Sequence, residues 1–289
     1  MKVLVTGGAG FIGHHTVRAL QAAGHRAVVF DNLRRGNFAR LPAGTPCVEG
    51  DVRDADALVE AAAGCEAIVH LAAQADVMGS ACDPRYAFET NVTGTWNAAR
   101  AAQQTGARLV FASSREVYGN PKKLPVREDA PRKPHNTYGL TKCLGEDIVA
   151  SEVLEVPGLA ILRLSNVVGP GDSGRVVPRW IEQAASGMPL TIYGGKQVLD
   201  FVPVETVTAA ILRCFERGAV DGPINIGSGR GTTLPELAMR LGTAGVEWLP
   251  ERAVDVQQFV ADTLRMRSVL GIAPPADPLA GIASAGASV

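Results

Sequence analysis

The sequence predicts an α/β protein in which a doubly wound parallel sheet carries a smaller, mixed C-terminal lobe. Through the first half of the 289 residues, short runs rich in Val, Ile and Leu alternate with Ala-rich stretches that favour helix. This alternation is typical of successive strand–helix–strand units around a buried parallel sheet. A glycine-rich turn between the first strand and the first helix supports the same fold. Apolar residues make up 46% of the chain and charged residues 20%, as in ordinary globular proteins.

The periodicity places the elements of the sheet in order. The expected strands occupy residues 2–6, 27–31, 47–50, 67–71, 108–113 and 158–164. The expected helices occupy residues 10–23, 56–63, 84–105 and 137–154, and each is closed or followed by a turn signal. Right-handed crossovers between consecutive strands then put helices on both faces of the sheet.

The composition of the sequence changes after residue 165, where glycines and prolines become frequent between short helical and extended segments. We expect residues 1–165 to form the sheet domain, and residues 166–199 and 228–289 to form the lobe. Residues 200–217, followed by 222–227, are expected to be a helix and a strand that return to the sheet. The Ala-, Gly- and Pro-rich tail, residues 271–289, is expected to be poorly ordered near its end.

Composition and charge argue against several classes of function. The net charge of -1 supplies no broad basic field, so we expect no nucleic-acid partner. No apolar run approaches the roughly 20 residues of a membrane span, and the N-terminal segment has the pattern of a strand rather than of a signal peptide. The five cysteines lack C-x-x-C spacing and a neighbouring histidine set, so we expect no metal site. These features predict a cytoplasmic protein without a membrane partner.

Gly7, Gly10 and Gly13 form a G-x-x-G-x-x-G turn that opens the first helix, with Phe11 and Ile12 at its start. Glycines there permit a tight turn and let backbone N–H groups and the helix N-terminus approach a pyrophosphate. A purely structural strand-to-helix turn explains the same spacing. The order of strand, glycines and helix indicates a dinucleotide site.

Asp31 ends the second expected strand, at the distance of about 20 residues where a carboxylate accepts hydrogen bonds from an adenosine ribose. A carboxylate there repels the 2′-phosphate of NADP, so the sequence favours NAD. Arg34 and Arg35 follow closely and keep NADP open as the alternative. Asp51 and Val52, after the third strand, are positioned to meet the adenine, although a solvated loop aspartate fits the spacing almost equally well.

The strongest catalytic signal is the pair Tyr138 and Lys142, which Y-x-x-x-K spacing puts on one face of a helix. Tyrosine has an unperturbed pKa of about 10, so its use as a base at neutral pH requires a neighbouring cation. Lys142, together with a bound nicotinamide, is expected to favour the phenolate of Tyr138. The pair alone is a weak signal, because many surface helices carry one by chance.

The order of the motifs resembles that of the extended short-chain dehydrogenase/reductase family, and especially its NAD-dependent nucleotide-sugar epimerases and dehydratases. The matching landmarks run from about residue 3 to about residue 262, nearly the whole chain. They are the glycine turn, Asp31, His70-Leu71-Ala72-Ala73, Asn91, Ser113-Ser114 before Val117-Tyr118-Gly119, Tyr138 with Lys142, and Arg163 before Asn166-Val167-Val168-Gly169-Pro170. This resemblance implies a Rossmann NAD-binding domain and a substrate-binding lobe.

The resemblance also implies roles for single residues in the transient oxidation of a sugar hydroxyl carbon by NAD. Ser114 would hydrogen-bond the reacting hydroxyl, Tyr138 would remove its proton, and Lys142 would tune Tyr138 while contacting the nicotinamide ribose. Tyr138 and Lys142 are thus expected to bind the cofactor as well. Asn166 and Arg252 would bind the diphosphate of the nucleotide-sugar substrate. The further residues expected to bind the cofactor are Asn32, Leu71, Ala72, Ala73, Asn91 and Ser113.

The chain departs from the family pattern at two places. Leu199 stands where relatives carry an arginine that binds the diphosphate. Arg175, which precedes Val176 in the expected substrate site, or Arg179 is expected to compensate, since guanidinium suits phosphate recognition. The second departure is Arg115 before Glu116, where sugar 4,6-dehydratases carry Asp-Glu. An arginine cannot donate the proton that the aspartic acid supplies, so ordinary 4,6-dehydration is disfavoured.

Three functions remain open on the sequence. Epimerisation, expected as 4-epimerisation of a UDP-sugar, needs only a base, a tightly held NAD and room for the oxidised sugar to present its other face. A dehydratase or decarboxylase with Glu116 as acid or base is the runner-up, although Glu116 fits a structural pair with Arg115 about equally well. The third is a sensor of NAD or sugar nucleotide without turnover, against which the presence of both Tyr138 and Lys142 argues. The resemblance also implies a homodimer through the helices at 84–105 and 137–154, although their apolar stripes could instead face this chain's own core.

Overall fold

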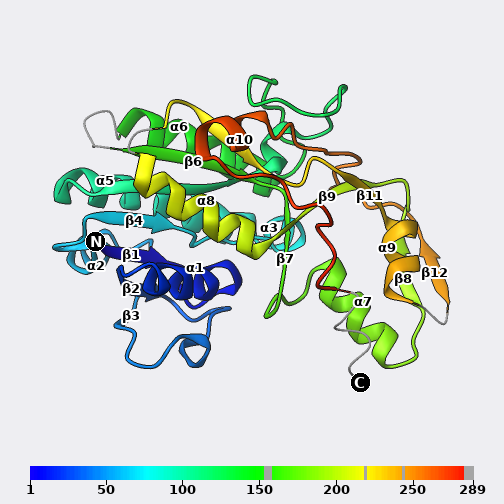
Figure 1. The fold of residues 1–289 in the computed structure, drawn as a ribbon, viewed down its shortest axis with the longest axis horizontal. Coiled ribbons are helices and arrows are strands. Elements are labelled where there is room, and N and C mark those ends of the chain that lie inside the picture. The colour runs from blue at the N-terminus through cyan, green and yellow to red at the C-terminus, as the bar shows by residue number, and fades with distance from the viewer. Residues whose placement is uncertain (153–157, 218–219, 243–244, 283–289) are drawn as a thin grey trace.

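A computed structural model describes residues 1–152, 158–217, 220–242 and 245–282 of the chain. Within these ranges, a parallel sheet of seven strands carries helices on both faces, and a smaller mixed lobe stands at one end of it (Figure 1). The fold class is therefore the one that the sequence predicts.

The main sheet has the strand order β10-β6-β5-β4-β1-β2-β3. The strands are β1 Lys2–Thr6, β2 Arg26–Asp31, β3 Cys47–Glu49, β4 Ala67–His70, β5 Arg108–Ser114, β6 Leu159–Leu164 and β10 Pro223–Ile226. The direction of strand addition reverses between β1 and β4, which pair in parallel with Thr6 opposite His70. The carboxyl ends of strands at such a switch point open the crevice in which doubly wound sheets bind ligands.

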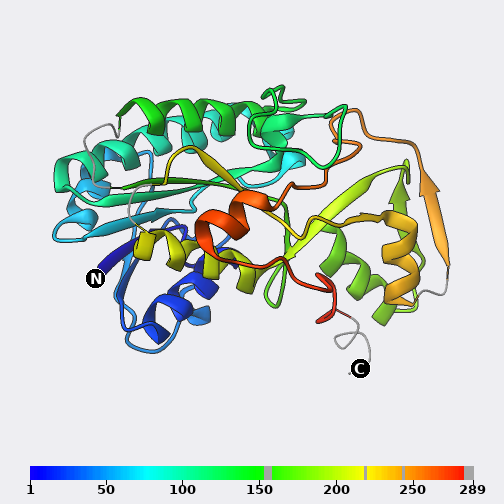
Figure 2. The ribbon, with the colours of Figure 1, turned by 45° about the horizontal axis from the view of Figure 1, so that its top comes forward.

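Two layers of helices cover the main sheet, as Figure 2 shows. One face is covered by α1 Phe11–Ala22, α8 Val204–Arg217 and α10 Leu264–Leu270, and the other by α2 Ala55–Ala62, α5 Gly94–Thr105 and α6 Thr137–Glu152. The alternation along β1 explains why both faces are apolar. Val3 and Val5 point into the cluster with α1 and α8, whereas Leu4 points into the cluster with α2 and α5, and all three are fully buried. Parallel strands covered on both faces need this continuous apolar run.

The small lobe combines two short sheets with two helices. Its elements are β7 Asn166–Val168, β9 Val198–Pro203 and β11 Gly231–Thr233 in one sheet, β8 Leu190–Tyr193 and β12 Val246–Leu249 in the other, and helices α7 Val176–Ala185 and α9 Leu234–Leu241. Trp180, Phe201 and Leu237 form its buried core. The described part of the expected tail also packs here, since Leu279 is only 1% exposed. Residues 283–289, on which the expectation of poor order falls, lie outside the described residues.

The helix expected over residues 84–105 is interrupted. It consists of α4 Pro84–Phe88, a π-helical turn η2 Glu89–Thr93, and α5, and a short unpredicted helix, α3 Val77–Cys82, precedes it. The π turn carries Asn91, whose carbonyl accepts a hydrogen bond from Thr95 Oγ1 at 2.6 Å. Such single π turns occur often at functional sites.

The helix expected from residue 200 begins four residues later, with α8 at Val204, so the prediction for residues 200–203 was wrong. These residues belong to β9, which pairs with β7 and β11. Pro203 explains the boundary, because a proline within a helix removes a backbone donor and clashes with the preceding turn. After α8 the chain does enter the main sheet, as β10 beside β6. On the other side of the sheet, α6 is described to Glu152, and the last two residues of the expected helix 137–154 lie outside the described part.

Two further 3-10 turns complete the elements: η1 Phe38–Arg40 and η3 Arg115–Tyr118. The second follows β5 directly and so fixes the direction in which Ser114, Arg115 and Glu116 leave the sheet.

Candidate active site

The turn after β1 depends on glycine for close packing. Gly7 has φ of +68°, and a Cβ placed there would lie 2.7 Å from the amide nitrogen of Ala72. A Cβ on Gly13 would lie 2.1 Å from the carbonyl oxygen of Gly7. Any side chain at either position would therefore force strand, turn and helix apart. The turn leaves the N-terminus of α1 facing the crevice at the switch point, where a helix favours an anion.

A cavity of about 500 Å³ runs from this turn to the small lobe, and we call it the central cavity. Most of the residues that the sequence predicts for the site lie in its wall. They are Gly7, Gly10, Phe11, Ile12, Gly13, Asp31, Asn32, Val52, Leu71, Ala72, Ala73, Ser113, Ser114, Glu116, Tyr138, Lys142, Asn166, Arg175, Val176 and Arg252. Asp51 and Asn91 are predicted for the site but do not line the cavity.

Asp31 ends β2 with both carboxylate oxygens held by backbone donors. The N–H of Ala9 donates to Oδ2 at 3.0 Å, and the N–H of Leu33 donates to Oδ1 at 2.9 Å. Burial raises the pKa of Asp31, and these two hydrogen bonds oppose the rise. The carboxylate is thus fixed in the cavity wall, with lone pairs left for a ligand hydroxyl.

Asp51 and Asn91 support the wall from behind. Asp51 accepts a hydrogen bond from the amide of Asn32 at 3.0 Å and pairs with Arg53 at 2.9 Å. Burial tends to raise the pKa of Asp51, but the bonds from Arg53 and Asn32 bring it down to about 2. Asn91 accepts from the backbone N–H of Gln74 at 2.7 Å and donates to Thr141 Oγ1 at 2.9 Å. Asn91 therefore ties the loop after β4 to α6.

Tyr138 and Lys142 lie on α6 beside the end of β5. Ser114 lies close enough to Tyr138 to favour its phenolate, and the Lys142 ammonium lies 5.9 Å from the Tyr138 ring centroid. Lys142 Nζ donates to the carbonyl of Ala112 at 2.7 Å, and the residue is 3% exposed. The Ser–Tyr–Lys set that the sequence predicts is therefore gathered at one end of the central cavity.

The pKa shifts of the pair differ in cause from the expectation. Burial raises the pKa of Tyr138 to about 12, and the groups that oppose the rise are Arg175, Ser114 and Arg115 rather than Lys142. Burial lowers the pKa of Lys142 to about 8, against the charge of Glu146. Tyr138 is thus a neutral phenol at pH 7 in the protein alone, and much of the charge that favours its phenolate must arrive with bound ligands.

Arg115 and Glu116 form an ion pair at 2.9 Å in the cavity wall, with side chains 11% and 6% exposed. The second carboxylate oxygen of Glu116 accepts from Asn136 Nδ2 at 2.8 Å. Arg115 Nη2 also reaches Asn166 Oδ1 at 3.5 Å. Both oxygens of Glu116 therefore have protein partners, as a structural carboxylate requires when it is buried.

The lobe side of the cavity carries three more arginines. Arg175 donates to the carbonyl of Val167 at 3.1 Å and lies 3.6 Å from Asp172, and Arg252 pairs with Asp255 at 2.9 Å. Arg179 lines the cavity, and no described residue pairs with its guanidinium. Leu199 forms part of the same wall.

Sequence reasoning missed several wall residues, among them Gln74, Asp172 and Gln197. Asp172 is the most notable, because its Oδ2 is buried and has no partner among the described residues. Its position directly after Gly169-Pro170-Gly171 was the available signal. Gln74 and Gln197 sit in loops whose approach to the cavity depends on long-range packing, for which the sequence gives no sign.

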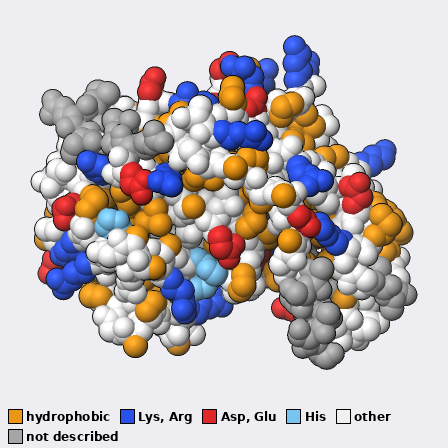
Figure 3. Space-filling view, viewed as in Figure 1, with side chains coloured by type: hydrophobic (Ala, Val, Ile, Leu, Met, Phe, Trp, Pro, Cys, Tyr) orange, Lys and Arg blue, Asp and Glu red, His pale blue; other side chains and the backbone are white. Residues whose placement is uncertain are grey.

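Within the described ranges, no group of three or more His, Cys, Asp or Glu side chains could hold a metal ion. No helix there combines the length and the apolar character needed to cross a bilayer. On the face drawn in Figure 3, basic and acidic side chains are interspersed over both the main body and the lobe.

A doubly wound sheet with a glycine turn at its switch point and a Ser–Tyr–Lys set in the wall of the same cavity defines a dinucleotide-dependent enzyme of the short-chain dehydrogenase/reductase class. The chain belongs to the NAD dependent epimerase/dehydratase family, whose model matches residues 3–227.

Similar proteins include both epimerases and dehydratases, the two kinds of enzyme that the family's description names. The UDP-glucose 4-epimerase of Azospirillum brasilense is 34% identical over 97% of this chain and 89% of its own length. The structure of UDP-glucose 4-epimerase from Thermotoga maritima with UDP-glucose has a TM-score of 0.93 at 30% identity, covering 99% of this chain and 98% of that one. The dTDP-glucose 4,6-dehydratase of Streptomyces venezuelae with NAD and TYD bound has a TM-score of 0.92 at 29% identity, covering 99% and 96%.

Proposed function

We propose that the chain is an NAD-dependent epimerase that inverts carbon 4 of a UDP-sugar. The observation that carries the proposal is that Ser114, Tyr138 and Lys142 lie together in the wall of a cavity that the glycine turn also lines. The similar enzymes from Azospirillum and Thermotoga support the choice of a UDP-sugar and of carbon 4.

The residues of the cavity fit NAD. The crevice suits a pyrophosphate, since Gly7, Gly10 and Gly13 line the cavity at the N-terminus of α1, where backbone N–H groups favour an anion. Asp31 would accept hydrogen bonds from the adenosine ribose, and Lys142 would contact the nicotinamide ribose. When bound, NAD supplies reversible oxidation of a sugar carbon.

The chain's own residues handle the proton and the orientation of the sugar. Ser114 would hold the reacting hydroxyl, and Tyr138 would take its proton at Oη while the Lys142 ammonium stabilises the phenolate. The proton would return from Tyr138 once the oxidised sugar has presented its other face. Asn166, Arg252 and Val176 would hold the nucleotide end, so that the sugar alone reorients.

The paired state of Glu116 favours epimerisation over elimination. An acid or base for elimination must exchange protons with the sugar, whereas both oxygens of Glu116 already accept from Arg115 and Asn136. Epimerisation needs no third acid. Incubating the protein with UDP-glucose and other nucleotide sugars in heavy water, with products followed by NMR, separates the two: a new C4 epimer without solvent deuterium supports the proposal, and deuterium at carbon 5 contradicts it.

Glu116→Gln should lower kcat on a UDP-sugar by less than tenfold. The amide keeps the shape of the side chain, and a catalytic acid or base would instead cost roughly 10²–10⁴-fold. Steady-state rates of the variant and of Asn136→Ala, which removes the neighbouring donor, test this. A loss above a hundredfold in Glu116→Gln alone would assign the carboxylate a direct role.

Arg179→Ala should weaken UDP binding about tenfold, on the order of 1.4 kcal/mol, because its guanidinium has no described partner to lose before it meets a phosphate. Arg175→Ala is the matched comparison and should weaken UDP less, since Arg175 already bonds Val167 and lies beside Asp172. Calorimetric titration with UDP measures both. The reverse ranking would make Arg175 the replacement for the guanidinium missing at Leu199.

A homodimer in the cytoplasm completes the proposal. Large apolar side chains remain exposed on the helices expected to pair, with Phe88, Trp96 and Leu140 exposed by 50%, 41% and 50%. Burying them between two copies would remove apolar surface that a monomer leaves in water. All five cysteines are free, as in a reducing compartment. Sedimentation of the purified chain would give its state of association.

A further inference from the structure

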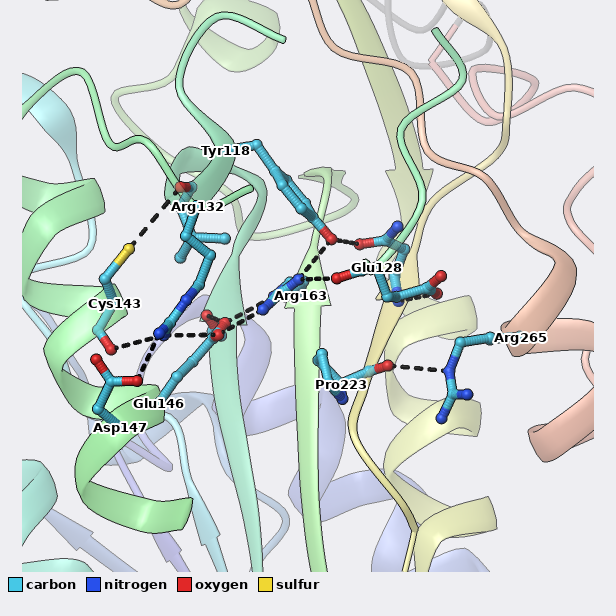
Figure 4. Close-up of polar contacts among 12 residues, drawn as sticks. Tyr118, Glu128, Arg132, Cys143, Glu146, Asp147, Arg163, Pro223 and Arg265 are labelled. Carbon is cyan, nitrogen blue, oxygen red and sulfur yellow. Dashed lines mark hydrogen bonds and ion pairs between the residues drawn. The ribbon is translucent and has the colours of Figure 1, made fainter. Parts of the chain in front are cut away.

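A buried ionic network joins α6, the helix that carries Tyr138 and Lys142, to β6 (Figure 4). At its centre, Glu146 of α6 accepts hydrogen bonds from Ser113 Oγ at 2.5 Å and from Arg163 Nε and Nη2 at 2.8 and 2.7 Å. Glu146, Ser113 and Arg163 are 3%, 2% and 4% exposed. A buried acid–base pair of this kind stabilises a fold only weakly, so its presence calls for another reason.

The network anchors three strands to one another. Arg163 on β6 donates through Nη1 to Tyr118 Oη at 2.8 Å, and Tyr118 donates to Asn225 Oδ1 of β10 at 2.7 Å. Arg132 approaches Glu146 from the loop before α6 at 3.4 Å. Of the network's members, Ser113 alone among the described residues reaches the wall of the central cavity. The network is therefore not itself a ligand site.

Three consecutive residues of β5 hold three residues of α6 that are spaced one turn apart. Ser114 lies beside Tyr138, the carbonyl of Ala112 accepts from Lys142, and Ser113 donates to Glu146. The i, i+4, i+8 spacing puts Tyr138, Lys142 and Glu146 on one face of the helix. Glu146 thus fixes the same strand–helix contact that places the catalytic pair.

The charges around Lys142 make Glu146 its main counter-charge. Lys142 Nζ lies 4.9 Å from the Phe111 ring, which stacks on His70 of β4. Burial, together with Lys142, lowers the pKa of His70 to about 3, so His70 is neutral at pH 7. Tyr138 faces Lys142 from its own helix and is a neutral phenol. Among the described residues, only the charge of Glu146 opposes the fall in the pKa of Lys142.

We propose that Glu146 is a positioning residue for Lys142: clamped by Ser113 and Arg163, its carboxylate holds the turn of α6 that carries the ammonium and places a negative charge one turn away from it. The inference rests on the proposed role of Lys142 only where it concerns turnover. Its electrostatic part concerns the protein without substrate.

The direct test is the titration of Lys142 in the ligand-free protein. The chain has six lysines, so ¹³Cε-lysine NMR resolves Lys142, with Lys142→Arg giving its assignment. Glu146→Gln should move the Lys142 midpoint about one pH unit lower, since a nearby opposite charge is worth about that much. Asp147→Asn is the matched control: Asp147 is the next residue and also pairs with Arg132, but its side chain is 59% exposed, so water screens its charge. In Asp147→Asn, the Lys142 midpoint should stay within a few tenths of a pH unit of the wild-type value.

Turnover gives the second readout. In Glu146→Gln the alkaline limb of kcat/KM should move to lower pH, while Glu146→Asp, which keeps the charge, should restore most of its position. If Glu146→Gln does not fold, the double variant Glu146→Gln/Arg163→Met removes both charges of the buried pair and should show the same lower midpoint. A Lys142 midpoint that is unchanged in these variants overturns the proposal, whatever their stability or activity. A lower midpoint without any epimerase activity would instead leave this inference intact and contradict the proposed function.

Discussion

Tyr138→Phe is expected to reduce turnover of a UDP-sugar by about a thousandfold while leaving NAD binding nearly unchanged. The variant removes only the Oη that would accept the substrate proton, and a positioned acid–base group contributes roughly 10²–10⁴-fold. The glycine turn, Asp31 and Lys142, which would hold the cofactor, remain in place. Rates by coupled assay and cofactor content by absorbance of the denatured protein measure the two properties.

Tyr118→Phe is the matched control for Tyr138→Phe. Tyr118 is buried and loses hydrogen bonds to Arg163 and Asn225, so its variant should lose stability, about 1–3 kcal/mol, rather than three orders of magnitude in rate. A Tyr138→Phe protein that turned over at wild-type rate would remove the base from the mechanism. A protein that never turns over, with or without Tyr138, would support the sensor interpretation instead.

Tyr138 and Lys142 govern the expected pH dependence of turnover. With the pKa of Lys142 about 8, its ammonium deprotonates as pH rises through 8, and turnover should fall because the cation proposed to stabilise the Tyr138 phenolate is lost. The linkage to stability has the opposite sign. Because the folded pKa lies below the value of about 10.4 in the unfolded chain, the unfolded state binds more protons between these limits. The burial cost of Lys142 is therefore present below pH 8 and is relieved as pH rises.

The main sheet was predictable because its signals are local. Each buried strand is a continuous apolar run, as in Val3-Leu4-Val5, and each glycine or cap lies within a few residues of the element that it ends. The small lobe was not, since β7 and β11 have only three residues each and find their partner β9 across 30 or more residues. Pro203 was the one local sign that a strand, and not a helix, precedes α8.

The candidate site likewise contains residues that the sequence predicts and residues that it does not. Motif residues such as Gly7, Asp31 and Tyr138 lie in the cavity wall, where sequence order places them. The residues that hold them in place depend on contacts between distant segments. An example is the hydrogen bond that Ser113 donates to Glu146, 33 residues away in the sequence. The electrostatics were the least predictable part, because burial and not Lys142 dominates the pKa of Tyr138.

Asp200→Ala is expected to produce the largest loss of stability, about 3 kcal/mol or more. Asp200 is fully buried in β9 and accepts from Ser228 N at 2.8 Å, Ser228 Oγ at 2.7 Å, Gly229 N at 3.0 Å and Ala261 N at 2.9 Å. The carboxylate thereby fastens β9 to two loops that are distant in sequence. Truncation would leave the buried backbone donors of Ser228 and Ala261 unpaired, at about 1–3 kcal/mol each, and would open that of Gly229 to water. Removal of a buried charge would partly offset this loss.

Replacing Asp200 should alter the candidate site as well as lower the stability of the fold. The carbonyl of Asp200 accepts from Asn166 Nδ2 at 3.0 Å, so a displaced β9 shifts Asn166 and the substrate wall. We expect a fall in unfolding temperature of roughly 6–12 °C by calorimetry, and a KM that rises more than kcat falls. Asp129→Ala, at an exposed surface pair with Arg127, should change stability by less than about 0.5 kcal/mol. Equal melting of the two variants would mean that relaxed loops or water satisfy the donors that Asp200 now holds.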